Sequence, residues 1–203
     1  MRERAGAARG ARPRDRAPHV RAPCDVARSV TVSCTHPSPL GELLLLADDA
    51  GLRGVYLPDH RRGPARIPNG DDGASRPAEA RTLPVLDALR EQLDAYFAGN
   101  LTAFDVPLAP EGTAFQRRVW EELARIPFGA TISYSALAER LGNRRAVRAV
   151  GLANGRNPIS IVVPCHRVIG ADGTLIGYGG GLERKRWLLE HEAVASGQRL
   201  LTT

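Results

Sequence analysis

The spacing of hydrophobic and polar residues divides the chain into two regions with different secondary structure. In the first region, alternation begins at Val26, and two apolar runs over residues 43–47 and 51–57 are separated by turn residues, which predicts a meander of strands. A helical period over residues 82–98 follows, and a Gly-Asn pair supplies its stop. We therefore predict a small amino-terminal sheet covered by one amphipathic helix.

The second region has the pattern of short helices joined by tight turns. Residues 113–116 have the spacing of a capping box, which marks the start of a helix whose inner face is expected to carry Phe115, Val119, Trp120 and Leu123. A second helix is predicted over residues 133–140 and a third over residues 144–154. Two short helices joined by a glycine-containing turn form a helix-turn-helix arrangement. A last helix is predicted over residues 182–192.

We predict a chain of mixed α/β (α+β) class, divided into four segments. The first is rich in arginine and proline and has few large apolar side chains, so it cannot offset the entropy of ordering and is expected to be disordered. Proline and glycine near residue 110 mark a domain boundary. The predicted segments are a disordered arm (1–24), an amino-terminal α/β domain with an exposed loop over 58–80 (25–109), a mainly helical domain (110–195) and a tail (196–203).

The composition sets limits on the compartment and on cofactors. Of 203 residues, 43% are hydrophobic, which suffices for an ordinary core, and no run approaches the roughly 20 apolar residues of a membrane span. The odd number of cysteines, three, argues against a disulfide framework and for a reducing compartment. Cys24, Cys34 and His36 lack the spacing of common zinc sites. We predict a cytoplasmic monomer without cofactor, metal or membrane contact.

The positive charge is concentrated in two places. Residues 1–22 hold seven arginines and two acidic residues, so most of the net charge of +6 belongs to the arm. The window over residues 140–171 holds no acidic residue, and such a cluster favours binding to a polyanion such as nucleic acid. An ordinary solvated arginine-rich helix is the alternative. The arginines of this window are Arg140, Arg144, Arg145, Arg148, Arg156 and Arg167.

The candidate chemistry lies in residues 159–168, an apolar run that predicts a buried strand. It stops at Pro164 and presents Cys165 beside His166. A thiol becomes a strong nucleophile as thiolate, and a neighbouring base can supply that activation. The alternative is a buried cysteine that acts as a small apolar filler. Because neighbouring side chains of an extended segment point opposite ways, we expect any link between Cys165 and His166 to be mediated.

These motifs resemble the O6-alkylguanine-DNA alkyltransferases. The match is continuous from about Gly112 to Glu192, weaker over the amino-terminal half, and absent from residues 1–25. The residues that carry it are Pro164-Cys165-His166-Arg167-Val168, Arg148-Ala149-Val150-Gly151, Asn157-Pro158 and Gly177-Tyr178-Gly179-Gly180-Gly181-Leu182. The resemblance implies a ribonuclease H-like amino-terminal domain and a winged-helix-like carboxy-terminal domain.

The resemblance also implies a function in DNA repair by direct reversal. Such a protein flips O6-alkylguanine out of double-stranded DNA and transfers the alkyl group irreversibly to its own cysteine, here Cys165, in a single turnover. This is a methylated-DNA–protein-cysteine methyltransferase activity, and whether O4-alkylthymine is also a substrate is left open. The family places its recognition helix in the minor groove, unlike most helix-turn-helix proteins.

The family motifs assign roles to individual residues. Besides Cys165, the implied catalytic residues are His166 as a base acting through a water, Glu192 as the carboxylate that orients it, and Tyr134 as the proton donor to the departing guanine. Arg148 would enter the space vacated by the flipped base. The other implied DNA contacts are Arg144, Arg145, Ser133, Ala149 and Asn143. The implied substrate pocket consists of Asn157, Pro158, Val168, Tyr178 and Gly179.

Two departures and two alternatives qualify this interpretation. Ile176 and Gly179 differ from the usual residues of relatives, which leaves the accepted alkyl size open. The zinc ligands of human-type relatives are not matched, so we predict no metal. The first alternative is a non-catalytic alkyltransferase-like protein that only binds lesions, which the presence of Cys165 opposes. The second is a thiol hydrolase using Cys165 and His166, which the adjacent arginine-bearing helix pair opposes.

Overall fold

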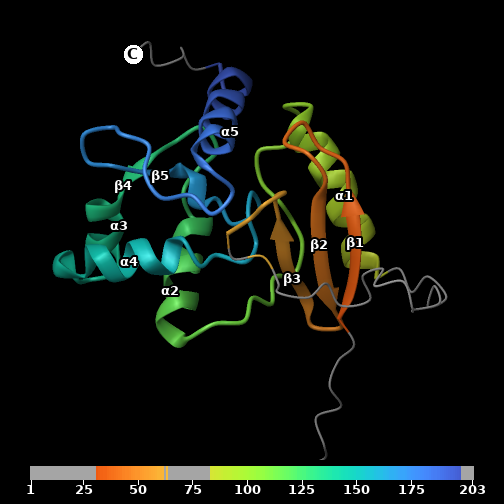
Figure 1. Ribbon diagram of the computed structural model, residues 1–203, viewed down its shortest axis with the longest axis horizontal. Coiled ribbons are helices and arrows are strands. Elements are labelled where there is room, and N and C mark those ends of the chain that lie inside the picture. Colours follow the sequence, from red (N-terminus) through yellow and green to blue (C-terminus); the bar gives the residue numbers. More distant parts are fainter. Residues whose placement is uncertain (1–30, 62, 64–82, 198–203) are drawn as a thin grey trace, which may run out of the picture.

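A computed structural model describes residues 31–61, 63 and 83–197. The predicted disordered arm over residues 1–24, most of the predicted loop over 58–80 and the end of the tail lie outside these residues. The described elements form two lobes, with a sheet and helix on one side and a group of short helices on the other (Figure 1). The mixed α/β class and the helix-turn-helix are confirmed. No helix within the described residues is long and apolar enough to cross a membrane.

The amino-terminal lobe is an antiparallel sheet with the strand order β1-β2-β3. Its strands pair in sequence, with Val32 opposite Ala47 and Leu44 opposite Tyr56, as expected of a meander. One face of the sheet carries a helix whose inward side chains recur at three- and four-residue spacing, and its buried leucines and Tyr96 form the core with β2 and β3. The elements are β1 (Val32–His36), β2 (Leu43–Asp48), β3 (Gly51–Tyr56) and α1 (Pro84–Phe97).

The carboxy-terminal lobe begins with a helix fixed by its capping box. Thr113 Oγ1 accepts from the Gln116 amide, and Gln116 Oε1 accepts from the Thr113 amide at 2.8 Å. Phe115 is 37% exposed, so its predicted place on the inner face is wrong; it is the second residue of the helix and lies in its first turn. The elements of this lobe are α2 (Ala114–Ala124), β4 (Ile132–Ser133), α3 (Tyr134–Arg140), η1 (Arg144–Ala146), α4 (Val147–Asn154), η2 (Cys165–Arg167), β5 (Val168–Ile169) and α5 (Leu182–Ala195).

The helix-turn-helix consists of α3 and α4, and we call α4 the recognition helix. Ser133 caps α3 by accepting from the Ala136 amide at 3.1 Å. The predicted third helix is divided, because its first turn is the tighter 3-10 helix η1, whose start Asn143 caps by accepting from the Arg145 amide. The buried Trp120 of α2 holds the recognition helix in place, since its Nε1–H donates to the Ala153 carbonyl at 2.9 Å.

Residues 159–168 are buried as predicted, but the prediction of a continuous strand is wrong. Ile161 has a φ of 72°, and hydrogen bonds from Val163 N to Ile159 O fold the segment back on itself. The Asn157 side chain stabilises this fold by donating to Val163 O at 2.7 Å. Within the segment, Val168 pairs with β4 in a short parallel ladder, and Ile159 forms a single parallel bridge with Val55 of β3. The apolar run therefore belongs to a compact buried loop.

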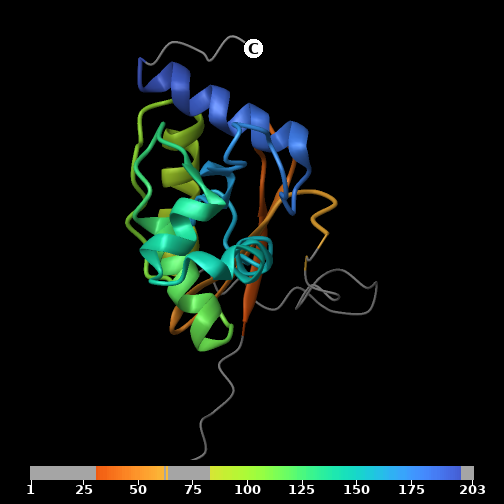
Figure 2. The same ribbon diagram turned by 90° about the vertical axis from the view of Figure 1, so that its left-hand side faces the viewer.

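The free edge of β3 joins the two lobes. Val55 N donates to Pro158 O at 2.9 Å, and Ser160 N donates to Val55 O at 3.0 Å. Further along the same edge, Leu52 exchanges hydrogen bonds with the chain at residues 107–109. The sheet edge thus supports the segment just before Cys165, while α5 lies across one end of the molecule (Figure 2).

Candidate active site

Cys165 opens the short helix η2 and is 5% exposed. Burial raises the pKa of its thiol, although the Asn157 amide, the Lys185 ammonium and two backbone N–H groups favour the thiolate. Burial is the larger effect, so the resting state is the thiol. A nucleophilic reaction at this sulfur therefore needs a base that removes the proton.

His166, the next residue in the chain, is the candidate for that base. Its ring is fully buried, and Nε2 lies 2.8 Å from Glu192 Oε1. Burial lowers the pKa of His166 despite the neighbouring carboxylate, so the imidazole is neutral near pH 7. Because the carboxylate accepts, Nε2 carries the proton and Nδ1 carries the lone pair. Nδ1 is buried and has no hydrogen-bond partner among the described residues.

Glu192 is the centre of a buried hydrogen-bond network. Its carboxylate accepts from Tyr96 Oη at 2.8 Å, from Gly129 N at 3.1 Å, from His166 Nε2, and from Arg167 Nε and Nη2, both at 2.9 Å. Burial opposes ionisation, but the hydrogen bond to His166 and the Arg167 guanidinium outweigh it, and the pKa of Glu192 lies well below its usual range. The network thus fixes an ionised carboxylate behind His166.

Arg167 belongs to this network, and its predicted place in the DNA-facing charge cluster is wrong. It is 6% exposed, its Nη1 donates to Ile126 O at 2.6 Å, and its guanidinium lies 5.7 Å from the centre of the Phe128 ring. Counting charges along the chain cannot separate a buried ion pair from a solvated one. The available signal was its position inside an apolar run, since a buried charge needs a partner. Tyr96, which sequence reasoning placed in the core, also contacts the site.

Tyr134 lies at the start of α3 and faces the glycine-rich segment. Its hydroxyl donates towards Ile176 O at 3.1 Å and Gly177 O at 3.2 Å. Burial, with a contribution from Cys165, raises the pKa of Tyr134 to about 12, so its hydroxyl stays protonated. The Asn154 side-chain amide lies 3.4 Å from this hydroxyl and 3.5 Å from Cys165 O, a connection that the sequence did not indicate.

Lys185 is a second residue that sequence reasoning missed. Its side chain is fully buried, and Nζ donates to Val168 O at 2.5 Å and to Ile176 O at 2.8 Å. Burial lowers its pKa to about 8, while Cys165 opposes this shift. Nζ also lies 5.9 Å from the centre of the Tyr134 ring. Lys185 thereby ties β5 to the segment that follows it.

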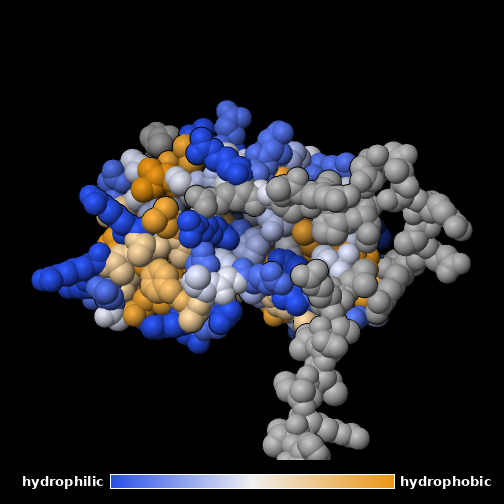
Figure 3. Space-filling model, turned by 60° about the horizontal axis from the view of Figure 1, so that its bottom comes forward, coloured by the Kyte–Doolittle hydropathy of each residue, from blue (hydrophilic) through white to orange (hydrophobic). Residues whose placement is uncertain are grey.

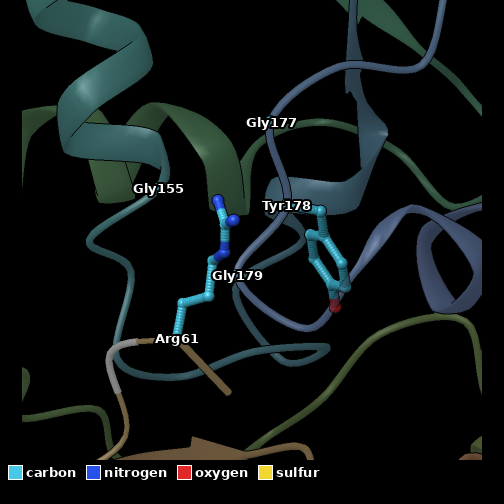
Figure 4. A pocket seen from close by; sticks show the side chains of 5 residues that line it. All are labelled: Arg61, Gly155, Gly177, Tyr178 and Gly179. Carbon is cyan, nitrogen blue, oxygen red and sulfur yellow. The ribbon is translucent and has the colours of Figure 1, made fainter. Parts of the chain in front are cut away.

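Residues 177–181, which we call the substrate loop, separate two cavities of about 630 Å³ each. Gly177 lines both. The first cavity is lined by Arg61, Gly155, Gly177, Tyr178 and Gly179 (Figure 4). The second, mostly apolar, is lined by residues of α3 and the recognition helix and by the chain before the loop, among them Tyr134, Arg148, Gly151, Leu152 and Ile176.

The remaining residues of the predicted pocket are closely packed. Asn157 is buried, and besides donating to Val163 O it accepts from the Ile159 amide at 3.1 Å. Pro158 contributes its carbonyl to the β3 edge, and Val168 is fully buried in β5. Pro158 and Val168 are not among the described residues that line the two cavities, so both contribute to the packing around the site.

The predicted DNA-facing residues lie together on the side formed by α3 and the recognition helix. Asn143, Arg144, Arg145, Arg148 and Ala149 are exposed, while Ser133 is half-buried because its side chain caps α3. Arg144 is held in an exposed ion pair with Glu139 at 3.2 Å. Figure 3 shows a hydrophobic area on this side of the molecule with hydrophilic side chains projecting around it.

Comparison with known proteins gave matches over most of the chain. The family model "6-O-methylguanine DNA methyltransferase, ribonuclease-like domain" matches residues 32–110, and "6-O-methylguanine DNA methyltransferase, DNA binding domain" matches residues 114–194. A methylated-DNA–protein-cysteine methyltransferase of Methanosarcina acetivorans is 50% identical over 155 residues, which is 76% of this chain and 94% of that protein. One of Mycobacterium leprae is 50% identical over 158 residues, 76% of this chain and 88% of that protein.

A solved structure is similar over a comparable length. The crystal structure of Mycobacterium tuberculosis OGT in complex with DNA aligns with a TM-score of 0.69 and 46% sequence identity. The alignment covers 80% of this chain and 93% of that chain.

Proposed function

The chain belongs to the 6-O-methylguanine DNA methyltransferase family, and from this premise we propose that the protein repairs DNA by moving the alkyl group of an O6-alkylguanine onto its own Cys165. The observation that carries the proposal is the buried thiol next to a neutral histidine whose Nε2 is held by an ionised carboxylate. The thioether product has no leaving group suited to reversal, so each chain reacts once.

The transfer is a displacement at the alkyl carbon. Cys165 Sγ forms a bond to this carbon as the bond from carbon to guanine O6 breaks. The thiol proton passes through a water to His166 Nδ1, whose lone pair has no partner among the described residues. The leaving guanine gains a proton from the Tyr134 hydroxyl, which returns to its protonated form as His166 loses its proton. In the net reaction, the alkyl group moves from guanine to the sulfur, and one proton moves from the thiol to guanine.

Access to the lesion requires a flipped nucleotide. We assign the recognition helix to the minor groove, with Arg148 in the space that the base leaves and with Arg144, Arg145, Asn143, Ser133 and Ala149 along the backbone. Small residues such as Ala149 and Gly151 suit close approach to a narrow groove. The flipped base would lie against the substrate loop, near Asn157, Tyr178 and Gly179.

The reaction also fits the predicted location. An unreacted thiol persists in a reducing compartment, and the proposed substrate is chromosomal DNA, so a cytoplasmic location is part of the proposal. We also propose that the protein acts as a monomer.

The direct test is mass spectrometry of the intact protein and its peptides after incubation with duplex DNA that contains O6-methylguanine. One added methyl group on the peptide containing Cys165 is expected, and Cys165→Ser should gain none. Tight binding without any methyl transfer would indicate a lesion-binding protein instead. Release of several product molecules per chain would indicate a hydrolase.

A further inference from the structure

The loop that follows β3 places an arginine at the first cavity beside the substrate loop. Figure 4 shows the Arg61 side chain extended towards the gap between Gly155, at the end of the recognition helix, and Gly177 and Gly179. Arg61 comes from the amino-terminal lobe, whereas the other residues lining this cavity come from the carboxy-terminal lobe.

The backbone of this loop is attached to the substrate loop. Arg61 N donates to Gly179 O at 3.1 Å. A Cβ atom built on Gly179 would overlap His60 Nε2, so the His60 ring packs directly on that glycine. Arg184 adds a further link, because its Nη1 donates to Pro58 O at 2.9 Å and to Gly180 O at 3.0 Å. The base of the Arg61 side chain is therefore fixed relative to the substrate loop.

The charge around this arginine suits an anionic ligand. Among the described residues, no carboxylate lines this cavity or forms an ion pair with Arg61, which is exposed. The adjoining cavity that Arg61 also lines contains one carboxylate, Asp59, and a second guanidinium, Arg184. Arg53 and Arg144, in contrast, are paired with Asp48 and Glu139. The glycines that line the cavity leave room for a backbone to approach closely.

The cavity lined by Arg61 adjoins the cavity lined by Arg148, and this arrangement indicates which anion the Arg61 cavity would bind. Gly177 lines both cavities, with Arg61 on one side of it and Arg148 on the other. If Arg148 occupies the space of the flipped base, a strand that crosses the substrate loop at Gly177 brings its next phosphates towards Arg61. A guanidinium binds a phosphodiester with two parallel hydrogen bonds.

We propose that Arg61 binds a backbone phosphate of the lesion-bearing strand beside the flipped nucleotide, as a DNA contact supplied by the amino-terminal lobe. The inference rests on the proposed function, since it takes duplex DNA as the ligand. Arg61 would add affinity and position the strand without touching the reacting atoms.

The test measures duplex binding as a function of salt, in a Cys165→Ala background so that no DNA is consumed. A phosphate contact adds about 0.9 to the slope of log K against log salt, which corresponds to roughly eightfold in affinity at 0.1 M salt. We expect Arg61→Ala to lose this part of the slope and the eightfold affinity, and Arg61→Lys to keep most of the slope. Arg186 is an exposed arginine of α5 that lines neither cavity, so Arg186→Ala should change neither the slope nor the affinity.

A second measurement uses the reactive protein and free O6-benzylguanine, which has no phosphate. Arg61→Ala should react with it within twofold of the unaltered protein, while its reaction with methylated duplex slows about eightfold. An unchanged salt slope, or equal losses with the free base and the duplex, would overturn the assignment. Failure of the unaltered protein to take up any methyl group would instead refute the proposed function.

Discussion

Replacing Tyr96 by phenylalanine tests the connection between the two lobes with a minimal change. Tyr96 belongs to α1 in the amino-terminal lobe and is fully buried, and its hydroxyl donates to Glu192 of α5 at 2.8 Å. Its pKa lies well above the usual range because of burial and the neighbouring carboxylate, so the hydroxyl is a donor at any working pH. Phenylalanine keeps the ring in place and removes only this hydrogen bond.

The expected cost follows from the kind of bond that is lost. A hydrogen bond to a charged acceptor contributes about 1.5–3 kcal/mol. The Glu192 carboxylate keeps its bonds from Gly129, His166 and Arg167, so it stays ionised in the variant. With a slope of about 2 kcal/mol/M in urea, a loss of about 2 kcal/mol lowers the unfolding midpoint by about 1 M.

The assay is urea unfolding followed by circular dichroism, with the transfer rate to free O6-benzylguanine measured in parallel. Tyr56→Phe is the matched control, because among the described residues the Tyr56 hydroxyl has no hydrogen-bond partner, and it should change the unfolding free energy by less than about 0.5 kcal/mol. Tyr96→Phe should keep its transfer rate within threefold. A stability loss below about 0.5 kcal/mol, or a tenfold slower transfer, would refute this account of the network.

Three further predictions concern buried ionisable groups at the site. Glu192→Gln should cost about 3–5 kcal/mol in urea unfolding, because it leaves the Arg167 guanidinium buried without its carboxylate; a loss below 1 kcal/mol would contradict this. Lys185→Met should slow transfer and destabilise the protein by about 2 kcal/mol or more, since two carbonyls lose their donor, whereas a more stable variant would contradict it. Because burial lowers the folded-state pKa of His166 below its ordinary 6.5, the unfolded state binds more protons between the two pKa values; this contribution to stability should be complete above about pH 6.5 and fall by at most about 1.4 kcal/mol per pH unit below it. The folded imidazole stays neutral in this window, so transfer should hold until the pH reaches the lowered pKa, and unfolding and rate series from pH 7.5 to 5.5 can check both; a transfer rate that already falls with the stability near pH 6.5 would contradict this.

The local features of this fold could be predicted from the sequence. The capping box at Thr113 and Gln116, the Ser133 cap and the helical spacing of α1 depend on residues within one or two turns of each other, and each was found where expected. The motif around Cys165 indicated a candidate site in the same way, because its residues are contiguous.

The features that were missed depend on contacts between distant parts of the chain. Ile161 adopts a left-handed conformation because the Asn157 side chain and the β3 edge fold the segment, and an apolar run does not reveal such contacts. Arg167 was counted with exposed arginines because only the fold brings Glu192 to it. Arg61 reaches the substrate loop from the other lobe, at a place that no pattern near residue 61 indicates.

The hydrogen bond from Trp120 to the recognition helix has a spectroscopic consequence. The chain has two tryptophans, and Trp120 is the one whose indole is bonded to the backbone of α4, at Ala153. The other, Trp187, is stacked on His191 in α5, with ring centres 5.0 Å apart. Replacing Trp187 by phenylalanine would leave a single emitter in contact with the recognition helix. The protein then carries its own fluorophore, and engagement of DNA can be followed in real time without attaching a label.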